Sequence, residues 1–188
     1  MDKLVIDDSF ISKWHPKYDE SEDDEKEYCD LVAKVSEELS KSDTLSEEVF
    51  IGILNWKSPR VKGKILDDFN YYAKGIKQAI NAPENQKIEI LDDLYGIGIP
   101  VASTILHIIY PKIYPIVDFR TVTVFKWSGY FNKKMHFYRN TNKGYDVFRA
   151  TIRDISNQNP NWNLRQIDRA LFAYHKTNAH LFGRESSC

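Results

Sequence analysis

Apolar residues at helical spacing flank a turn with two glycines, Leu94-Tyr95-Gly96-Ile97-Gly98, near the middle of the chain. They recur every three or four positions: Ile88, Leu91 and Leu94 before the turn, and Val101, Ile105 and Ile108 after it. This spacing predicts two helices paired as a hairpin over residues 86–110. Because glycine tolerates positive φ, Gly96 and Gly98 are expected to allow a tight turn that aims backbone N–H groups outward. Such a turn suits a phosphate, and a purely structural turn between packed helices is the alternative.

Helix start and stop signals divide the first half of the chain. The acidic run over residues 19–25 predicts a helix that ends within residues 40–43, and Ser46 predicts the cap of the next helix. Pro59 breaks that second helix within Asn55-Trp56-Lys57-Ser58-Pro59-Arg60. Residues 59–81 are then expected to form one long helix.

The second half of the chain carries similar signals. Asp118 is expected to cap a helix that runs to about Trp127, and residues 128–144 are expected to be irregular. Helices resume over residues 145–157, and Asn163 begins a capping-box-like start for a last helix. No convincing alternation of period two occurs, so the sequence predicts an all-α fold.

Length and composition bound the function classes. A chain of 188 residues is most simply one domain, residues 1–188, or two small lobes. The chain start lacks the pattern of a secretory signal, and its longest apolar stretch, Ile105 to Tyr110, is too short to cross a bilayer. A cytoplasmic protein without a membrane partner is expected.

Cys29 and Cys188 cannot build a disulfide framework or a four-cysteine cluster, and the five histidines show no zinc-site spacing. No catalytic metal is expected.

The net charge of −1 hides a strong asymmetry along the chain. Residues 1–48 form an acidic segment with 16 acidic and 6 basic side chains, whereas residues 49–188 hold 11 acidic and 20 basic side chains. The part of the chain with the hairpin is therefore expected to be basic, as a surface that neutralises phosphates should be. Ordinary scatter of solvated charges is the alternative.

The hairpin segment and the residues after it resemble the signature of the helix-hairpin-helix (HhH-GPD) DNA glycosylase superfamily. In that family a Leu-Pro-Gly-Val/Ile-Gly turn is followed by small residues that allow close helix packing, and by an aspartate at a helix start about twenty residues later. Here Leu94 to Ser103 match the turn and its sequel, and Asp118 in Tyr114-Pro115-Ile116-Val117-Asp118 follows Gly98 by 20 positions. The match covers about 35 residues directly.

This resemblance implies a glycosylase-like fold, a two-lobed helical bundle with a helix-hairpin-helix motif, and it implies roles for the matching residues. Gly96, Ile97 and Gly98 would bind a DNA phosphate through backbone N–H groups, with Pro100 and Ala102 at the same interface. A monovalent cation on the hairpin carbonyls would be the sole cofactor. Asp118 would face the sugar of a nucleotide rotated out of double-stranded DNA, where its carboxylate stabilises the positive charge that develops as the base leaves, or activates the attacking water. A plain helix cap is the alternative role of Asp118, and the two roles are compatible.

Further residues follow from the same resemblance. Asn55, Trp56, Lys57 and Arg60 align with the loop that probes the duplex, and Arg120 lies where relatives place a phosphate contact. A buried tryptophan in a solvated basic turn, and a surface ion pair for Arg120, are the alternatives. Trp127 and Tyr71 are candidates for stacking on the base, although aromatic residues at helical spacing usually belong to the core.

Two departures from the family restrict the expected reaction. Members that also cut the strand carry a lysine four positions after the first hairpin glycine, and this chain has Pro100 there. Without that amine a Schiff base cannot form at the usual place, so a monofunctional hydrolase, without the family's iron–sulfur cluster and acting as a monomer, is expected. The competing hypotheses are a non-catalytic helix-hairpin-helix DNA-binding protein and an unrelated helical protein with a tight turn.

Overall fold

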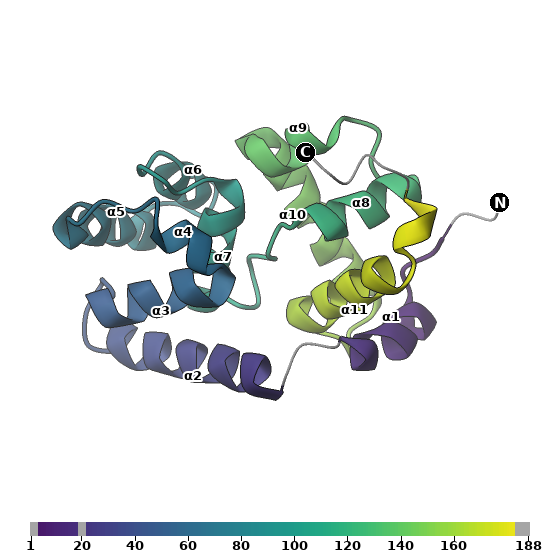
Figure 1. Ribbon diagram of the computed structural model, residues 1–188, viewed down its shortest axis with the longest axis horizontal. Helices are drawn as coiled ribbons and strands as arrows, with labels where there is room; N and C mark the ends of the chain where they lie inside the picture. Colours follow the sequence, from purple (N-terminus) through teal and green to yellow (C-terminus); the bar gives the residue numbers. More distant parts are fainter. Residues whose placement is uncertain (1–3, 19–21, 183–188) are drawn as a thin grey trace. The chain divides into compact units, whose positions relative to one another are not determined.

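The computed structural model describes residues 4–18 and 22–182 and divides the chain into two compact units. Glu20–Pro111 form one unit, called the hairpin unit below, and Met1–Asp19 with Lys112–Cys188 form the other, called the terminal unit (Figure 1). All regular secondary structure in the described residues is helical, which confirms the predicted all-α class. None of the described helices is both long enough and apolar enough to span a bilayer.

The hairpin unit is built from six helices of the described chain. They are α2 (Glu22–Leu39), α3 (Glu47–Lys57), α4 (Pro59–Lys62), α5 (Phe69–Asn81), α6 (Lys87–Asp92) and α7 (Ile99–Ile109). Helix α7 packs against α2, α3 and α6, and α5 packs against α6. Nine of the eleven α7 residues are buried, so α7 is the central element of this unit. A buried hydrogen bond of 3.0 Å joins Tyr28 Oη on α2 to His107 Nε2 on α7.

The terminal unit is gathered around its last long helix. Its described α-helices are α1 (Asp8–Trp14), α8 (Phe119–Trp127), α9 (Met135–Asn140), α10 (Asn142–Gln158) and α11 (Leu164–Thr177). Two short 3₁₀ helices, η1 (His15–Lys17) and η2 (Ala179–Leu181), complete the described part of this unit. Helix α11 contacts α1, η1, α8 and α10. Phe125 of α8 lies at the centre, with its ring centroid 5.0 Å from that of Phe131 and 6.0 Å from that of Phe148.

Several predicted helix ends are confirmed by their capping bonds. Ser46 caps α3 by accepting from the Val49 N–H at 3.3 Å. Asn163 and Gln166 form the predicted capping box at the start of α11. Helix α2 ends at Leu39, just before the predicted stop; Asp19, Glu20 and Ser21 of its predicted start, like Cys188, lie outside the described residues.

The prediction of one long helix over residues 59–81 is wrong. Helix α4 ends at Lys62, and α5 begins only at Phe69, where the Asp68 carboxylate accepts from the Tyr71 N–H at 3.4 Å. A side-chain cap of this kind competes with a continuous helix, because it satisfies the amides of a new first turn.

The prediction of an irregular segment over residues 128–144 is also wrong for its second half. Helix α9 occupies residues 135–140, and Thr141 caps α10 by accepting from the Gly144 N–H at 3.0 Å. A Cβ atom on Gly144 would overlap the Phe137 carbonyl oxygen, so the glycine lets the α9 and α10 backbones approach closely. Helix α1 was not predicted; Asp7 caps it by accepting from the Phe10 N–H at 2.9 Å.

Candidate functional site

The turn between α6 and α7 has the predicted hairpin form, with one difference at its glycines. Gly96 has a φ of 75°, whereas Gly98 has an ordinary extended conformation (φ −106°, ψ 172°) as the N-cap of α7. The prediction that both glycines allow positive φ therefore holds at Gly96 alone. A Cβ atom on Gly96 would lie 2.6 Å from the Lys64 carbonyl oxygen, so glycine is required there for space as well as for conformation.

The turn exposes two backbone amides at the start of α7. Gly96 and Gly98 are exposed, while Ile97 between them is buried and donates its N–H to the Leu94 carbonyl at 2.9 Å. Within the part of the chain that the structure describes, no hydrogen bond reaches the N–H of Gly96 or of Gly98. Unpaired amides at the positive end of a helix dipole can bind an anion such as a phosphate.

Two tyrosines of α5 hold this turn in place. The buried Tyr72 hydroxyl accepts from the Leu66 N–H and donates to the Tyr95 carbonyl, both at 3.0 Å. The Tyr71 hydroxyl accepts from the Tyr95 N–H at 3.2 Å, and 39% of Tyr71 is exposed. The structure therefore brings Tyr71, a candidate from the sequence for stacking on the base, to the hairpin turn, and Tyr72 makes a second set of contacts there.

The other predicted hairpin residues, Pro100 and Ala102, follow the turn at the start of α7. Pro100 stands in the first turn of α7, and its carbonyl accepts from the hydroxyls of Ser103 and Thr104. Ala102 is fully buried, and its N–H donates to the Gly98 carbonyl at 2.9 Å, so its part is close helix packing. No hydrogen bond from the described residues reaches the carbonyl oxygens of Gly96 and Ile97, which could serve as ligands for a monovalent cation.

A carboxylate at the end of α6 modifies the charge at this helix start. Burial, and then the neighbouring charge of Asp93, raise the pKa of Asp92, while its interaction with the Ile99 N–H acts in the opposite direction. Asp92 thus competes with an incoming anion for the positive end of α7. No sequence signal singled it out.

The predicted probing segment is partly helical. Asn55, Trp56 and Lys57 form the last turn of α3, and the chain breaks at Ser58 as predicted. Trp56 is half-buried, with its ring centroid 5.6 Å from that of Tyr28, which fits the structural alternative for this residue. Arg60 is exposed on α4.

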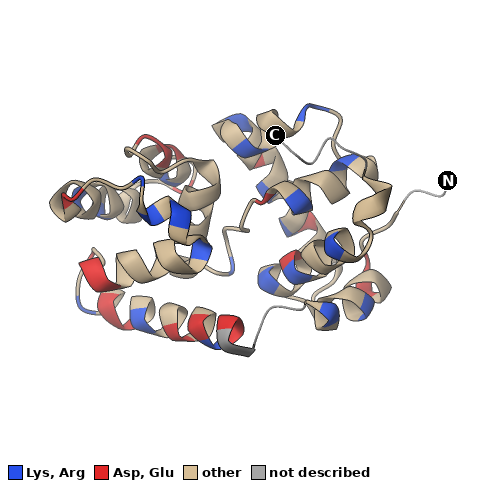
Figure 2. Ribbon diagram, in the orientation of Figure 1, with Lys and Arg blue, Asp and Glu red and all other residues tan. Residues whose placement is uncertain are grey.

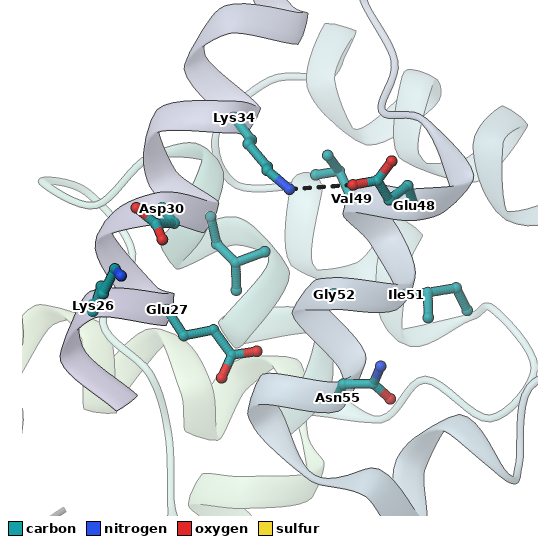
Figure 3. Close-up of a pocket in the computed structure, with 10 residues that line it drawn as sticks. Lys26, Glu27, Asp30, Lys34, Glu48, Val49, Ile51, Gly52 and Asn55 are labelled. Carbon is teal, nitrogen blue, oxygen red and sulfur yellow. Dashed lines mark hydrogen bonds and ion pairs between the residues drawn. The ribbon is translucent and has the colours of Figure 1, made fainter. Parts of the chain in front are cut away.

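A groove of about 550 Å³ separates α2 from α3, and Asn55 lines it. Figure 3 shows Lys34 reaching across this groove to Glu48, with Asn55 at the opposite end. Its lining carries two basic and three acidic side chains: Lys26, Lys34, Glu27, Asp30 and Glu48. This balance does not favour a phosphate backbone.

Asp118 lies in the terminal unit as the N-cap of α8. Its Oδ1 accepts from the Arg120 N–H at 2.8 Å, and Thr121 completes a capping box. The Arg120 guanidinium lies 4.0 Å from the same oxygen, and the two side chains are 29% (Asp118) and 36% (Arg120) exposed. The carboxylate is therefore accessible rather than locked in a buried ion pair. The Arg120 guanidinium also packs over Phe119 and Phe172, at 5.0 and 4.5 Å from their ring centroids.

Sequence reasoning missed one polar group beside Asp118, namely His175 near the end of α11. His175 is 5% exposed, and neither ring nitrogen has a hydrogen-bond partner among the described residues. It stacks on Phe182 with ring centroids 4.7 Å apart and an interplanar angle of 7°, and it meets Phe119 edge-on at 5.3 Å. Burial and the Arg120 charge lower the pKa of His175, and Asp118 acts in the opposite direction. No spacing pattern in the sequence could have linked residue 175 to residue 118.

Trp127 stands at the other end of α8 and is 37% exposed. Its ring centroid lies 5.7 Å from that of Phe182 and 6.3 Å from that of Tyr174. Phe182 thus contacts both Trp127 and His175, so a cluster of aromatic rings extends along the α8–α11 pair.

The charge distribution corrects the expectation of a basic hairpin region. The hairpin unit carries 18 acidic and 10 basic side chains, whereas the terminal unit carries 9 acidic and 16 basic ones. Figure 2 shows acidic residues along α2 of the hairpin unit. Residues 49–111 alone have 7 bases and 6 acids, so the positive balance after residue 48 comes from residues 112–188. The surplus of basic side chains therefore belongs to the unit that contains Asp118 rather than to the hairpin unit.

The described residues contain no group of three or more histidine, cysteine, aspartate or glutamate side chains that could hold a metal ion. Comparison of the chain with protein-family models, with curated proteins and with solved structures gives no match. The function must therefore be inferred from the geometry at the hairpin and at Asp118.

Proposed function

We propose that this protein is a monofunctional DNA glycosylase that hydrolyses the N-glycosidic bond of a damaged or modified base flipped out of duplex DNA. Under this proposal the enzyme is a cytoplasmic monomer, and its partner is double-stranded DNA. The observation that carries it is the turn after α6, which exposes two unpaired amides at Gly96 and Gly98 and is followed after 20 residues by the accessible carboxylate of Asp118.

The hairpin supplies a contact that is independent of base sequence. Backbone amides at a helix start bind a phosphate without reading the base beside it, so the hairpin would position the duplex rather than select the lesion. Tyr71 and Tyr72 hold the turn from α5, so the amides are already oriented before DNA arrives.

Asp118 supplies the chemistry. When a glycosidic bond breaks, positive charge develops on the sugar, and a fixed carboxylate stabilises it. The capping bonds to Arg120 N–H and Thr121 hold Asp118 in one orientation and leave its carboxylate partly exposed to a ligand. Under this proposal the carboxylate also accepts a proton from the attacking water.

The expected product is an abasic site without strand scission. Strand cleavage through a Schiff base needs an amine, and the corresponding position holds Pro100 in the first turn of α7.

The substitution Asp118→Asn tests this function cleanly. Asparagine caps a helix about as well as aspartate, so the fold should persist while the charge is lost. We expect base release from lesion-bearing duplexes to fall about 10²–10³-fold, measured as abasic sites revealed by alkaline cleavage. Asp7→Asn is the matched control, because Asp7 caps α1 in the same unit and should leave release unchanged. Full release by Asp118→Asn would exclude the mechanism.

A non-catalytic DNA-binding protein is the second candidate, favoured by the complete capping box at Asp118. It predicts salt-sensitive DNA binding with no base release from any duplex, and unchanged binding in Asp118→Asn.

A further inference from the structure

The His175 imidazole has no hydrogen-bond partner among residues 4–18 and 22–182, which are those the structure describes. Both of its ring nitrogens are buried. A neutral imidazole carries one N–H donor and one lone-pair acceptor, and leaving both unsatisfied in a protein interior costs stability. Buried polar groups are nearly always paired, so an exception needs an explanation. A partner that binds from outside the chain provides one.

The surroundings of His175 fix its ring. Phe182 stacks on one face, and Phe119, the residue after Asp118, meets the ring edge-on. Arg120 is held in turn over Phe119 and Phe172, the latter three positions before His175 on α11. The start of α8 and the end of α11 therefore bring a carboxylate, a guanidinium and an imidazole together around the rings of Phe119, Phe172 and Phe182.

Two charged groups act on the ring, Arg120 and Asp118, and they act in opposite directions. Burial is the largest influence and disfavours the charged imidazolium. His175 is therefore neutral near pH 7 and offers a donor to a group that accepts a hydrogen bond.

We propose that His175 donates a hydrogen bond from its ring N–H to the departing base at the Asp118 site, and so favours the release of uncharged bases. This inference rests on the proposed glycosylase function. The C1′–N bond breaks with its electron pair passing to the base, water oxygen forms the new bond to C1′, and a water proton passes to the Asp118 carboxylate. His175 keeps its proton throughout and stabilises the negative charge that develops on the base. Because both nitrogens are covered in the free protein, a side chain next to the ring must move when the nucleotide enters.

An uncharged leaving base needs such a donor, whereas a base already carrying a positive charge does not. Alkylation at N7 of guanine makes the base cationic, so it leaves without accumulating negative charge. The hydrogen bond from His175 should therefore matter for hypoxanthine or uracil and contribute little for 7-methylguanine.

The experiment compares His175→Phe and His175→Gln with the wild-type full-length protein. Phenylalanine keeps a planar ring and removes both nitrogens, whereas glutamine keeps an N–H donor. We expect His175→Phe to lower kcat for an uncharged base about 10²-fold, with little change in KM. For 7-methylguanine the same variant should lower kcat less than about threefold. His175→Gln should recover most of the kcat that His175→Phe loses on the uncharged base.

Thermal unfolding without DNA supplies an independent measurement. Replacing an unpaired buried imidazole by an apolar ring should raise Tm by about 2–4 °C in His175→Phe. A lowered Tm would show that His175 has a structural role, and equal kcat losses on both kinds of base would overturn the inference on their own.

The outcomes also separate this inference from the function on which it rests. A wild-type protein that releases no base from any duplex overturns both. A wild-type protein that releases only 7-methylguanine, or an unchanged kcat in His175→Phe on an uncharged base, overturns the role of His175 and leaves the glycosylase function standing.

Discussion

Helix α7 of the hairpin unit and helix α8 of the terminal unit begin in opposite ways. Helix α7 has a glycine N-cap with no side-chain hydrogen bond, and no described residue accepts from the N–H of Gly96 or of Gly98. Helix α8 has an aspartate N-cap whose carboxylate satisfies its own first turn through a capping box. The first start is open to an anion, and the second presents an anion of its own. The positive end of the helix dipole is thus left without a side-chain cap at α7 and is occupied by the helix's own carboxylate at α8.

The largest effect is expected from a substitution of Gly96, which tests whether the turn that begins α7 depends on this glycine. Gly96→Ala forces a side chain into a positive φ and against the Lys64 carbonyl, 2.6 Å away, so we expect a loss of about 2–4 kcal/mol in the free energy of unfolding. Gly98→Ala is the control, because its Cβ would meet only Pro100 Cδ at 3.9 Å in an ordinary conformation. It should cost at most about 1 kcal/mol. Denaturant unfolding measures both, and equal losses would show that the turn is not held at Gly96.

The next largest effect is expected from a substitution that makes the start of α7 resemble the start of α8. Gly98→Asp gives α7 a side-chain cap and a negative charge, so we expect DNA affinity to fall roughly tenfold at moderate salt, about 1.4 kcal/mol. Gly98→Asn caps the helix without the charge and should lose less. Fluorescence anisotropy with a labelled duplex measures both constants. If Gly98→Asp bound DNA as tightly as the wild type, the phosphate contact could not lie at this helix start.

The smallest expected effect concerns Asp92, the acid that competes at the open start. Asp92→Asn should raise DNA affinity about two- to fivefold, because it removes a carboxylate near the amino end of α7. Glu84→Gln, in the loop before α6, is a charge-matched control that should change affinity less. An unchanged affinity in Asp92→Asn would place the bound phosphate away from Asp92.

The same residue predicts a pH dependence of stability with a definite sign. Its raised pKa means that protonation of Asp92 favours the folded chain. Relative to Asp92→Asn, the wild type should be most stable below about pH 4 and should lose that advantage as the pH rises through the raised pKa. Chemical unfolding over this pH range measures the difference between the two proteins, and the opposite slope would contradict the assignment of burial as the main cause.

Local signals predicted the elements that local physics controls. Ser46, Asp118 and Asn163 were predicted as caps and are caps, because a cap bond joins residues two or three apart. The hairpin was predicted from the period of its apolar residues. The predicted long helix failed over residues 63–68, where the chain leaves α4 and the Asp68 cap starts α5. Tyr72 of α5 then donates to the Tyr95 carbonyl of the hairpin turn, a contact between residues 23 positions apart that helical spacing does not encode.

The sequence by itself determined the helical class, the paired helices around Gly96 and Gly98, and Asp118 at a helix start, since each depends on neighbours within a few residues. Tertiary structure alone decided that His175 lies beside Asp118, that Tyr71 and Tyr72 hold the hairpin turn, and that the basic surplus belongs to the terminal unit. Those facts depend on packing between segments far apart in the chain, which periodicity and spacing do not encode.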